Sequence, residues 1–258
     1  MRRFFCLLCL SVCLLFGVEG FKVKIGVSIP VQEYFVKKIG GEFVDVEVLV
    51  PPARNPKFFE PTASQVKMIK NLSVYIASGI PFEKKWLKRF ENANPSLRVL
   101  DLGSNACKEA ICYQWLSIQL AKKRAKKIAY ILRSVDIKNA KIYKENLRVF
   151  LKELQDMENK IKQRLALPAT PKVFAGFQGT WRDFAKDYNL QYLDIKNPED
   201  LKIFREQKLK KVLITPFDVK KQVRAIIANP KVEIVEINPY SLGWEENLLQ
   251  ILSCVVGE

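Results

Sequence analysis

Cysteine and histidine usage limits the chemistry that this chain of 258 residues could perform, because it contains no histidine at all. Without imidazole, a histidine-dependent hydrolase and a zinc site built on histidine are both excluded. Cys107 and Cys112 are close enough in sequence to close a small loop as a disulfide, or they could be two metal thiolates. Since no second cysteine pair and no histidine supply further ligands, we favour the disulfide. Cys254 would then be a free thiol, buried beside its apolar neighbours.

No set of residues indicates catalysis or a cofactor. The sequence shows neither a nucleophile with a matching base nor a pair of acids, so we do not expect an enzyme. The one feature that favours an enzyme is that Cys107 or Cys112 could be a reactive thiol. Residues 176–179 hold two glycines but lack the spacing of a phosphate-binding loop. The four tryptophans could line a cleft, but ordinary burial preference favours a domain interface.

The first 20 residues have the pattern of a secretory signal. Arg2 and Arg3 precede an apolar stretch at 4–18, and cleavage is expected near Gly20. The apolar stretch is short, which favours a cleaved signal over a membrane anchor. Val12 before Cys13 is not the small residue that a lipoprotein signal requires. We therefore expect a periplasmic or otherwise extracytoplasmic protein.

The net charge of +16 is spread along the chain, and most of it remains after residues 1–20 are removed. The densest basic cluster, at 122–127, has no aromatic residues beside it of the kind that nucleic-acid binders use. We interpret it as a solvated helix face and expect no nucleic-acid partner. With 48% hydrophobic and 27% charged residues, the chain is predicted to be globular, with one or two domains, and monomeric.

Short apolar runs alternate with helical patterns in two series, which predicts two α/β domains with parallel-rich sheets. The first series has strands at 23–29, 44–50, 73–78 and 97–102, with helices at 32–39, 63–72 and 82–92. The second has strands at 172–177, 191–195, 211–215 and 232–237, with helices at 181–188, 199–207, 219–228 and 245–256.

Between the two series, residues 139–166 contain no glycine or proline. Apolar residues recur there every three or four positions, which predicts one amphipathic helix about 40 Å long that joins the domains as a rigid spine. Asp136 is the expected N-cap, and Pro168 ends the pattern. The predicted organisation is a signal peptide at 1–20, an N-terminal domain at 21–135, a linker helix at 136–167 and a C-terminal domain at 168–258.

Several segments resemble a known family. Residues 38–41, 46–52 and 55–62, the last reading Asn-Pro-Lys-Phe-Phe-Glu-Pro-Thr, are similar to the opening of the cluster A-I (family 9) periplasmic solute-binding proteins. The likeness continues, in the family's order, at 77–79, 83–87, 114–116, 139–146, 184–190, 197–201 and 237–239. It implies the zinc- or manganese-binding receptor of an ABC importer, with two α/β domains, a spine helix and a permease of the inner membrane as partner.

The chain departs from the family at the metal site. The resemblance places the family's three histidines and one acidic ligand at Lys57, Tyr113, Gln178 and Asn238. Asn55 stands in the place of an aspartate, and Glu60 either orients the cleft loop or leads into the next helix. A lysine brings a cation to the site, and amides and a neutral phenol are weak ligands for Zn²⁺ or Mn²⁺. All four metal ligands are thus predicted to be replaced.

Three interpretations of the altered site remain open. The Lys57 ammonium could occupy the cation position, solvated by oxygens of Gln178, Asn238 and Tyr113. The site could be unused, so that the chain is an envelope scaffold that has lost solute binding. Alternatively, Lys57 with Arg54 and Arg182 could attract an anion or another small solute that the sequence does not identify.

Overall fold

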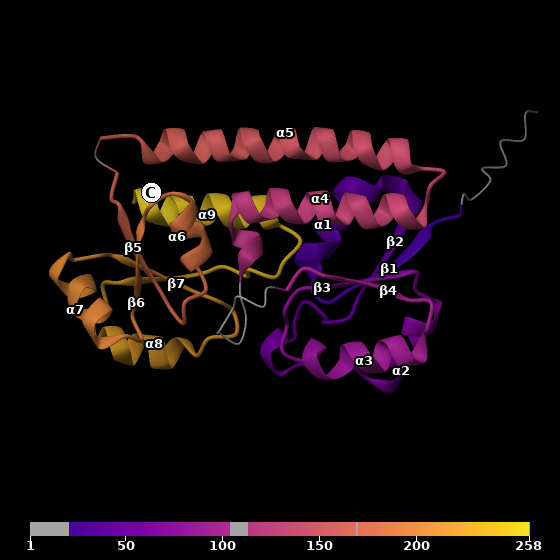
Figure 1. Cartoon of the computed structure of the whole chain (residues 1–258). Coiled ribbons are helices and arrows are strands. Elements are labelled where there is room, and N and C mark those ends of the chain that lie inside the picture. Colours follow the sequence, from indigo (N-terminus) through magenta and orange to yellow (C-terminus); the bar gives the residue numbers. More distant parts are fainter. Residues whose placement is uncertain (1–20, 104–112, 169, 258) are drawn as a thin grey trace, which may run out of the picture.

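Each half of the chain forms a parallel sheet covered by helices. The structure, a computed structural model, describes residues 21–103, 113–168 and 170–257. Within these residues lie two four-stranded sheets with equivalent strand orders, β2-β1-β3-β4 and β6-β5-β7-β8. Every strand pairing in both sheets is parallel. The predicted fold class, two α/β domains with a helical spine, is confirmed (Figure 1).

The N-terminal sheet is built from short apolar strands with helices between them. Its elements are β1 (Val23–Val27), α1 (Pro30–Gly40), β2 (Val44–Val48), α2 (Ala63–Met68), β3 (Val74–Ala77), α3 (Glu83–Ala93) and β4 (Arg98–Asp101). All four residues of β3 are buried, as expected for an inner strand of a parallel sheet covered on both faces. Helix α1 starts with Pro30 at its first position and is capped at its C-terminal end by Gly41, whose φ of +57° favours glycine.

The C-terminal sheet repeats this plan. Its elements are β5 (Val173–Gly176), α6 (Arg182–Asp187), β6 (Gln191–Asp194), α7 (Pro198–Glu206), β7 (Lys211–Ile214), α8 (Lys220–Ile227), β8 (Glu233–Glu236) and α9 (Trp244–Val256). Helix α9 carries a continuous buried stripe that includes Leu248, Ile251 and Val255. The stripe belongs to the core that also contains the apolar residues of α1 and α5, so the last helix of the chain packs against the N-terminal half.

The predicted spine is α5 (Ala140–Leu165), and it does not cross the molecule alone. Helix α4 (Ile118–Val135) lies along it, and α5 contacts α1 on the N-terminal side and α9 on the C-terminal side (Figure 1). The buried side chains Tyr143, Phe150, Leu154 and Ile161 recur on one face of α5, as the apolar spacing predicts. The linker is therefore a pair of helices. The domain boundaries expected on either side of α5 stay a prediction.

The start of α5 corrects one expectation, because Asp136 is not its N-cap. Asp136 ends α4, where its backbone N–H donates to Leu132 O, and α5 begins after Asn139. The Asp136 carboxylate instead accepts hydrogen bonds from the Asn139 side chain at 2.8 Å and from the Tyr143 hydroxyl at 2.6 Å. It thus braces the tight connection between the two helices, but it lies three residues upstream of Asn139, which holds the N-cap position of α5.

Two of the four tryptophans lie at the interface between the halves, as burial preference predicts. Trp115 Nε1 donates to Pro239 O at 2.6 Å, and Trp244 Nε1 donates to Trp115 O at 2.5 Å. Both rings are almost fully buried. Trp181 is equally buried within the C-terminal half, and Trp86 is half-buried on α3. Residues far apart in the chain are thereby joined through buried N–H donors and backbone acceptors.

In the part of the chain that the structure describes, no helix has the length and apolar character required to traverse a lipid bilayer.

The interface makes a stability prediction. Trp244→Phe removes the N–H that satisfies the buried Trp115 carbonyl. It also replaces the indole, whose centroid lies 5.2 Å from that of the Phe35 ring, by a smaller ring. We expect the free energy of unfolding to fall by about 2–3 kcal/mol, from the unsatisfied acceptor and the lost volume together. Guanidinium denaturation followed by far-UV circular dichroism measures this.

Trp86→Phe is the matched control, because Trp86 donates its N–H to the exposed Glu60 carboxylate. Its loss of stability should stay below about 1 kcal/mol, since water can replace a partner at the surface. Equal effects of the two variants would show that the Trp244 hydrogen bond is not a main support of the interface.

Candidate functional site

The candidate site lies where loops at the carboxyl ends of the two sheets come together. Lys57 follows β2 and Tyr113 follows β4, whereas Gln178 follows β5 and Asn238 follows β8. In open parallel sheets, ligands bind beyond the carboxyl ends of the strands, because the connecting loops converge there. The arrangement therefore brings loops of both halves together, and we call the region between them the cleft.

Lys57 reaches from the N-terminal half to the C-terminal half. It lies in a short helical turn, Pro56–Phe58, which Asn55 caps by accepting the Lys57 N–H at 3.0 Å. The Lys57 ammonium donates to Gln178 Oε1 at 2.9 Å, 121 residues along the chain. Both side chains are half-buried. A cation is thus held across the cleft by an amide oxygen, and Asn55 stabilises the turn that presents it.

The backbone around Gln178 is held in an unusual conformation by Asp194. Gln178 and Gly179 both have positive φ, at 61° and 71°. The Gln178 N–H donates to Asp194 Oδ1 at 3.1 Å, and Asp194 is 9% exposed. Arg182 Nη2 lies 3.6 Å from Asp194 Oδ2. Arg182 thus pairs with the carboxylate that positions Gln178. The role of Asp194 was not predicted, because in the sequence only its place at the end of a strand distinguishes it.

Tyr113 is engaged by another phenol. The Tyr240 hydroxyl donates to Tyr113 Oη at 2.9 Å, and the two ring centroids lie 5.6 Å apart. Both side chains are more than nine-tenths buried. Burial, and then the neighbouring Tyr113, raise the pKa of Tyr240 well above its ordinary value. Tyr240 is therefore a neutral phenol and not a phenolate that could serve as an anionic ligand.

Asn238 stabilises the turn that follows β8. Its Oδ1 accepts the Tyr240 N–H at 3.0 Å, and its backbone oxygen accepts from Asn247 Nδ2 at 2.7 Å. Of the oxygens that the sequence predicts around Lys57, Gln178 is the one that bonds to the ammonium within the described residues. The structure brings Lys57 and Gln178 together, whereas Tyr113 and Asn238 both bond to Tyr240.

Carboxylates and thiolates do not converge into a metal site in the described ranges 21–103, 113–168 and 170–257. No group of three or more Cys, Asp or Glu side chains is placed there to hold an ion. Such donors are what transition metals require in the absence of histidine. Cys254 is an unpaired, half-buried thiol. Cys107 and Cys112, with the predicted disulfide, and the signal at 1–20 lie outside the described residues.

Glu60 connects the Lys57 loop to α3. Its carboxylate accepts from Trp86 Nε1 at 2.5 Å and from Lys85 Nζ at 3.3 Å. The Trp86 hydrogen bond is the main reason why the pKa of Glu60 is lowered. The contacts agree with a role in orienting the loop, which stays a prediction.

Glu83, the first residue of the segment 83–87 that resembles the family, is a buried carboxyl group. It accepts the backbone N–H groups of Ser78, Gly79 and Ile80 at 2.7–3.0 Å, and the Ser28 hydroxyl. Burial outweighs these hydrogen bonds and raises the pKa of Glu83 to about 7. In the sequence, Glu83 is recognisable only as a glutamate in the first turn of a helix that follows a strand. This pattern is common and does not by itself predict burial.

The fold matches a known class of protein. The structure of ZnuA has a TM-score of 0.82 and 30% identity, with 92% of this chain and 98% of that one covered. A zinc-bound deletion mutant of ZnuA has the same TM-score at 29% identity, over 91% of this chain and 97% of that one. These likenesses define the chain as a two-domain binding protein of the periplasmic metal-binding type.

The sequence comparisons give the family. The model of the family "Zinc-uptake complex component A periplasmic" (ZnuA) matches residues 25–238, most of the chain, so the protein belongs to this family. The manganese ABC transporter substrate-binding lipoprotein PsaA of Streptococcus pneumoniae is 25% identical over 218 residues. The metal ABC transporter substrate-binding lipoprotein FimA of Streptococcus parasanguinis is 25% identical over 217 residues. Each of these alignments covers 74% of this chain and 70% of the relative. The resemblance inferred from the motifs is confirmed.

The raised pKa of Glu83 makes a prediction about pH dependence. The folded protein binds this proton more tightly than the unfolded chain, whose glutamate pKa is near 4.5. Stability should therefore fall as pH rises from about 4.5 to about 7, and no further above that interval from this group. Urea unfolding at a series of pH values measures the slope, which Glu83→Gln should reduce in this interval.

Glu91→Gln is the control, because Glu91 is exposed on the same helix. This variant should leave the slope unchanged. If Glu83→Gln also leaves it unchanged, Glu83 is not the group that titrates in this interval.

Proposed function

We propose that this protein is the extracytoplasmic substrate-binding component of an ABC importer, and that its cleft does not bind Zn²⁺ or Mn²⁺ through the family's ligand positions. The observation that carries the proposal is the hydrogen bond from the Lys57 ammonium to Gln178 Oε1 at 2.9 Å. By resemblance, both residues stand where other members of the family place histidine ligands. A side-chain cation therefore lies where a metal ion would have to be coordinated.

The chemistry of the four positions supports the loss of metal binding. An ammonium has no lone pair to donate, and it repels a divalent ion. Tyr113 accepts a hydrogen bond from the neutral Tyr240 phenol, and the Asn238 amide oxygen is used by a backbone N–H. To coordinate a metal, these groups would have to give up buried hydrogen bonds, and such groups are costly to leave unpaired.

Family membership supports an importer permease of the inner membrane as the partner. The two curated relatives are named as substrate-binding lipoproteins of ABC transporters. For this chain we propose a periplasmic location after signal cleavage near Gly20. A binding component of this kind performs no catalysis, and its task is to hold a solute between its halves and present it to the permease.

A second candidate function is the binding of a small anionic solute beside Lys57. A hollow of about 650 Å³ lies on the same loop and is lined by Arg54, Asn55 and Phe58 among others. Its volume is in the range of small-molecule sites. Phe58 is 84% exposed, so the hollow combines an apolar wall with a guanidinium. Arg182 contributes less to this candidate, because it already pairs with Asp194.

Metal titration tests the proposal directly. We expect no zinc or manganese binding tighter than micromolar by isothermal titration calorimetry of the purified protein, and no stoichiometric metal by elemental analysis. The physical reason is that the four positions offer a cation and neutral groups where the ion needs strong donors. A submicromolar dissociation constant for either metal would show that the proposed loss is wrong.

Restoring the ligand set tests the residue assignment. A variant that combines Lys57→His, Tyr113→His, Gln178→His and Asn238→Asp should bind zinc at least about 100-fold more tightly than the natural chain, because four donors then converge. Lys57→Met is the control, which removes the cation without adding a ligand and should gain little. If the combined variant folds, by circular dichroism, and gains no affinity, the four positions are not the family's ligand positions.

A further inference from the structure

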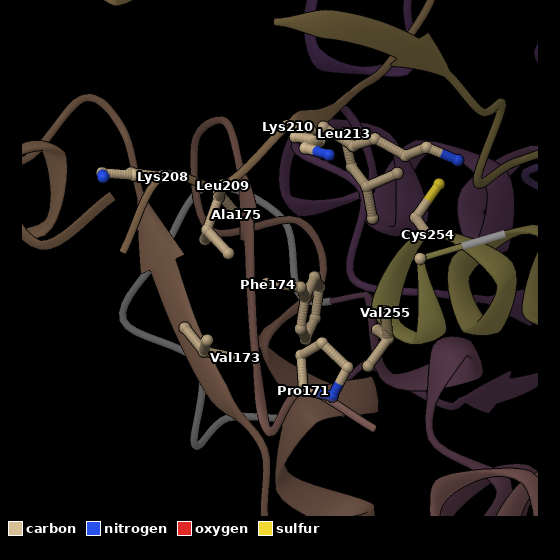
Figure 2. Close-up of a pocket in the computed structure, with 12 residues that line it drawn as sticks. Pro171, Val173, Phe174, Ala175, Lys208, Leu209, Lys210, Leu213, Cys254 and Val255 are labelled. Atoms are coloured by element: carbon tan, nitrogen blue, oxygen red, sulfur yellow. The ribbon is translucent and has the colours of Figure 1, made fainter. Parts of the chain in front are cut away.

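A second hollow lies at the amino-terminal ends of the strands of the C-terminal sheet, whereas the cleft lies at their carboxyl ends. Its lining includes Val173, the first residue of β5, and Lys211, the first residue of β7. Gln178 and Asn238, in contrast, follow the last residues of their strands. The hollow has a volume of about 290 Å³. We call it the β5–α9 pocket, since its walls come from the start of β5, the segment 208–213 and the end of α9 (Figure 2).

The inner wall of the β5–α9 pocket is apolar. Phe174, Leu213 and Val255 line it, and each is at most 4% exposed, so these side chains are fixed by the core behind them. Figure 2 shows Cys254 and Val255 of α9 on one side, Phe174 between, and Leu209 toward the other side. A pocket wall built from rigid core side chains is largely formed before a ligand arrives.

The rim of the pocket carries positive charge. Lys208, Lys210 and Lys211 line it, and no Asp or Glu stands among the described lining residues. Lys211 Nζ lies 3.8 Å from Glu233, a weak pairing, whereas Lys208 and Lys210 form no ion pair with any residue in the described ranges. Figure 2 places Lys210 beside Leu213, next to the apolar wall, and Lys208 at the outer end. An apolar wall with the ammonium groups of Lys208 and Lys210 at its rim is complementary to an amphipathic anion.

The volume limits the size of that anion. If each non-hydrogen atom needs about the 30 Å³ that a water molecule takes up in the liquid, the pocket holds roughly ten such atoms. Seven chain carbons and one carboxylate, as in octanoate, fill this space. A zwitterionic amino acid would leave its ammonium beside the lysines, and an inorganic anion would leave the apolar wall unused.

We propose that the β5–α9 pocket binds a small apolar carboxylate about the size of octanoate. The hydrocarbon tail packs on Phe174, Leu213 and Val255, and the carboxylate pairs with Lys210 at the rim. The site is separate from the cleft, so this proposal does not depend on the function proposed for Lys57 and Gln178. The pocket selects a chemical class of ligand, and both a straight-chain and an aromatic acid of this size belong to that class.

Cys254 supplies a probe, because it lines the pocket as a half-buried thiol. The rate of Cys254 alkylation by N-ethylmaleimide, followed by mass spectrometry of its peptide, should fall severalfold with octanoate at millimolar concentration. Octanol should protect less, and octylammonium should not protect, since the lysines repel it. 3-Phenylpropionate distinguishes an aromatic ligand from a straight-chain one, and tighter protection by either acid supports the proposal.

Two variants test the role of the rim. Lys210→Gln should weaken octanoate binding about threefold, the effect of one exposed ion pair, and leave octanol binding unchanged. Lys221→Gln is the control, an exposed lysine on α8 outside the pocket, and should change neither. Equal protection by octanoate and octanol, an equal effect of the two lysine variants, or no protection by either acid would overturn the proposal.

Discussion

The turn at 238–240 is the contact on which the geometry of the cleft depends, because it anchors the C-terminal sheet to the N-terminal half. Tyr240 O accepts the Val31 N–H at the start of α1 at 2.8 Å, and the Tyr240 hydroxyl donates to Tyr113. Pro239 O accepts the Trp115 indole N–H. These partners are buried, so each broken bond would leave a polar group without water. The turn thereby sets the separation of the loops that carry Lys57 and Gln178.

This anchoring separates the four residues of the candidate site into two pairs. Tyr113 and Asn238 have become part of the contact between the halves, through hydroxyl and amide hydrogen bonds to Tyr240. Lys57 and Gln178 form the bond across the cleft, on loops supported by Asn55 and Asp194. The four positions that we propose to correspond to the family's metal ligands are divided here between an interface and a lysine–amide pair.

The order of strands and helices could be predicted from sequence because each element shows its own local period. The strand predicted at 73–78 has an apolar core at 74–77, and the helix predicted at 139–166 repeats every three or four residues, so both were predicted within a few residues of their observed ends. The Lys57–Gln178 pair was predictable only through resemblance to a family. Tyr240 and Asp194 were missed, because their partners lie more than 100 and 16 residues away, respectively, and no local pattern records such a pairing. Of the helix from 118 to 135, only the charged face at 122–127 was predicted. Its buried side includes Arg124 among apolar residues, and this charged residue weakens the apolar periodicity.

The Lys57–Gln178 bond has a consequence for exchange with the surroundings. A dissociable ion occupies a receptor in proportion to its free concentration, whereas the Lys57 ammonium is covalently tethered to the loop that presents it. A tethered group acts at an effective concentration on the order of millimolar, whatever the solution contains. Dilution or a chelator therefore cannot empty this position, and no transporter can take its cation away. Only a competitor for the Gln178 oxygen, or a movement of the two halves, can release it.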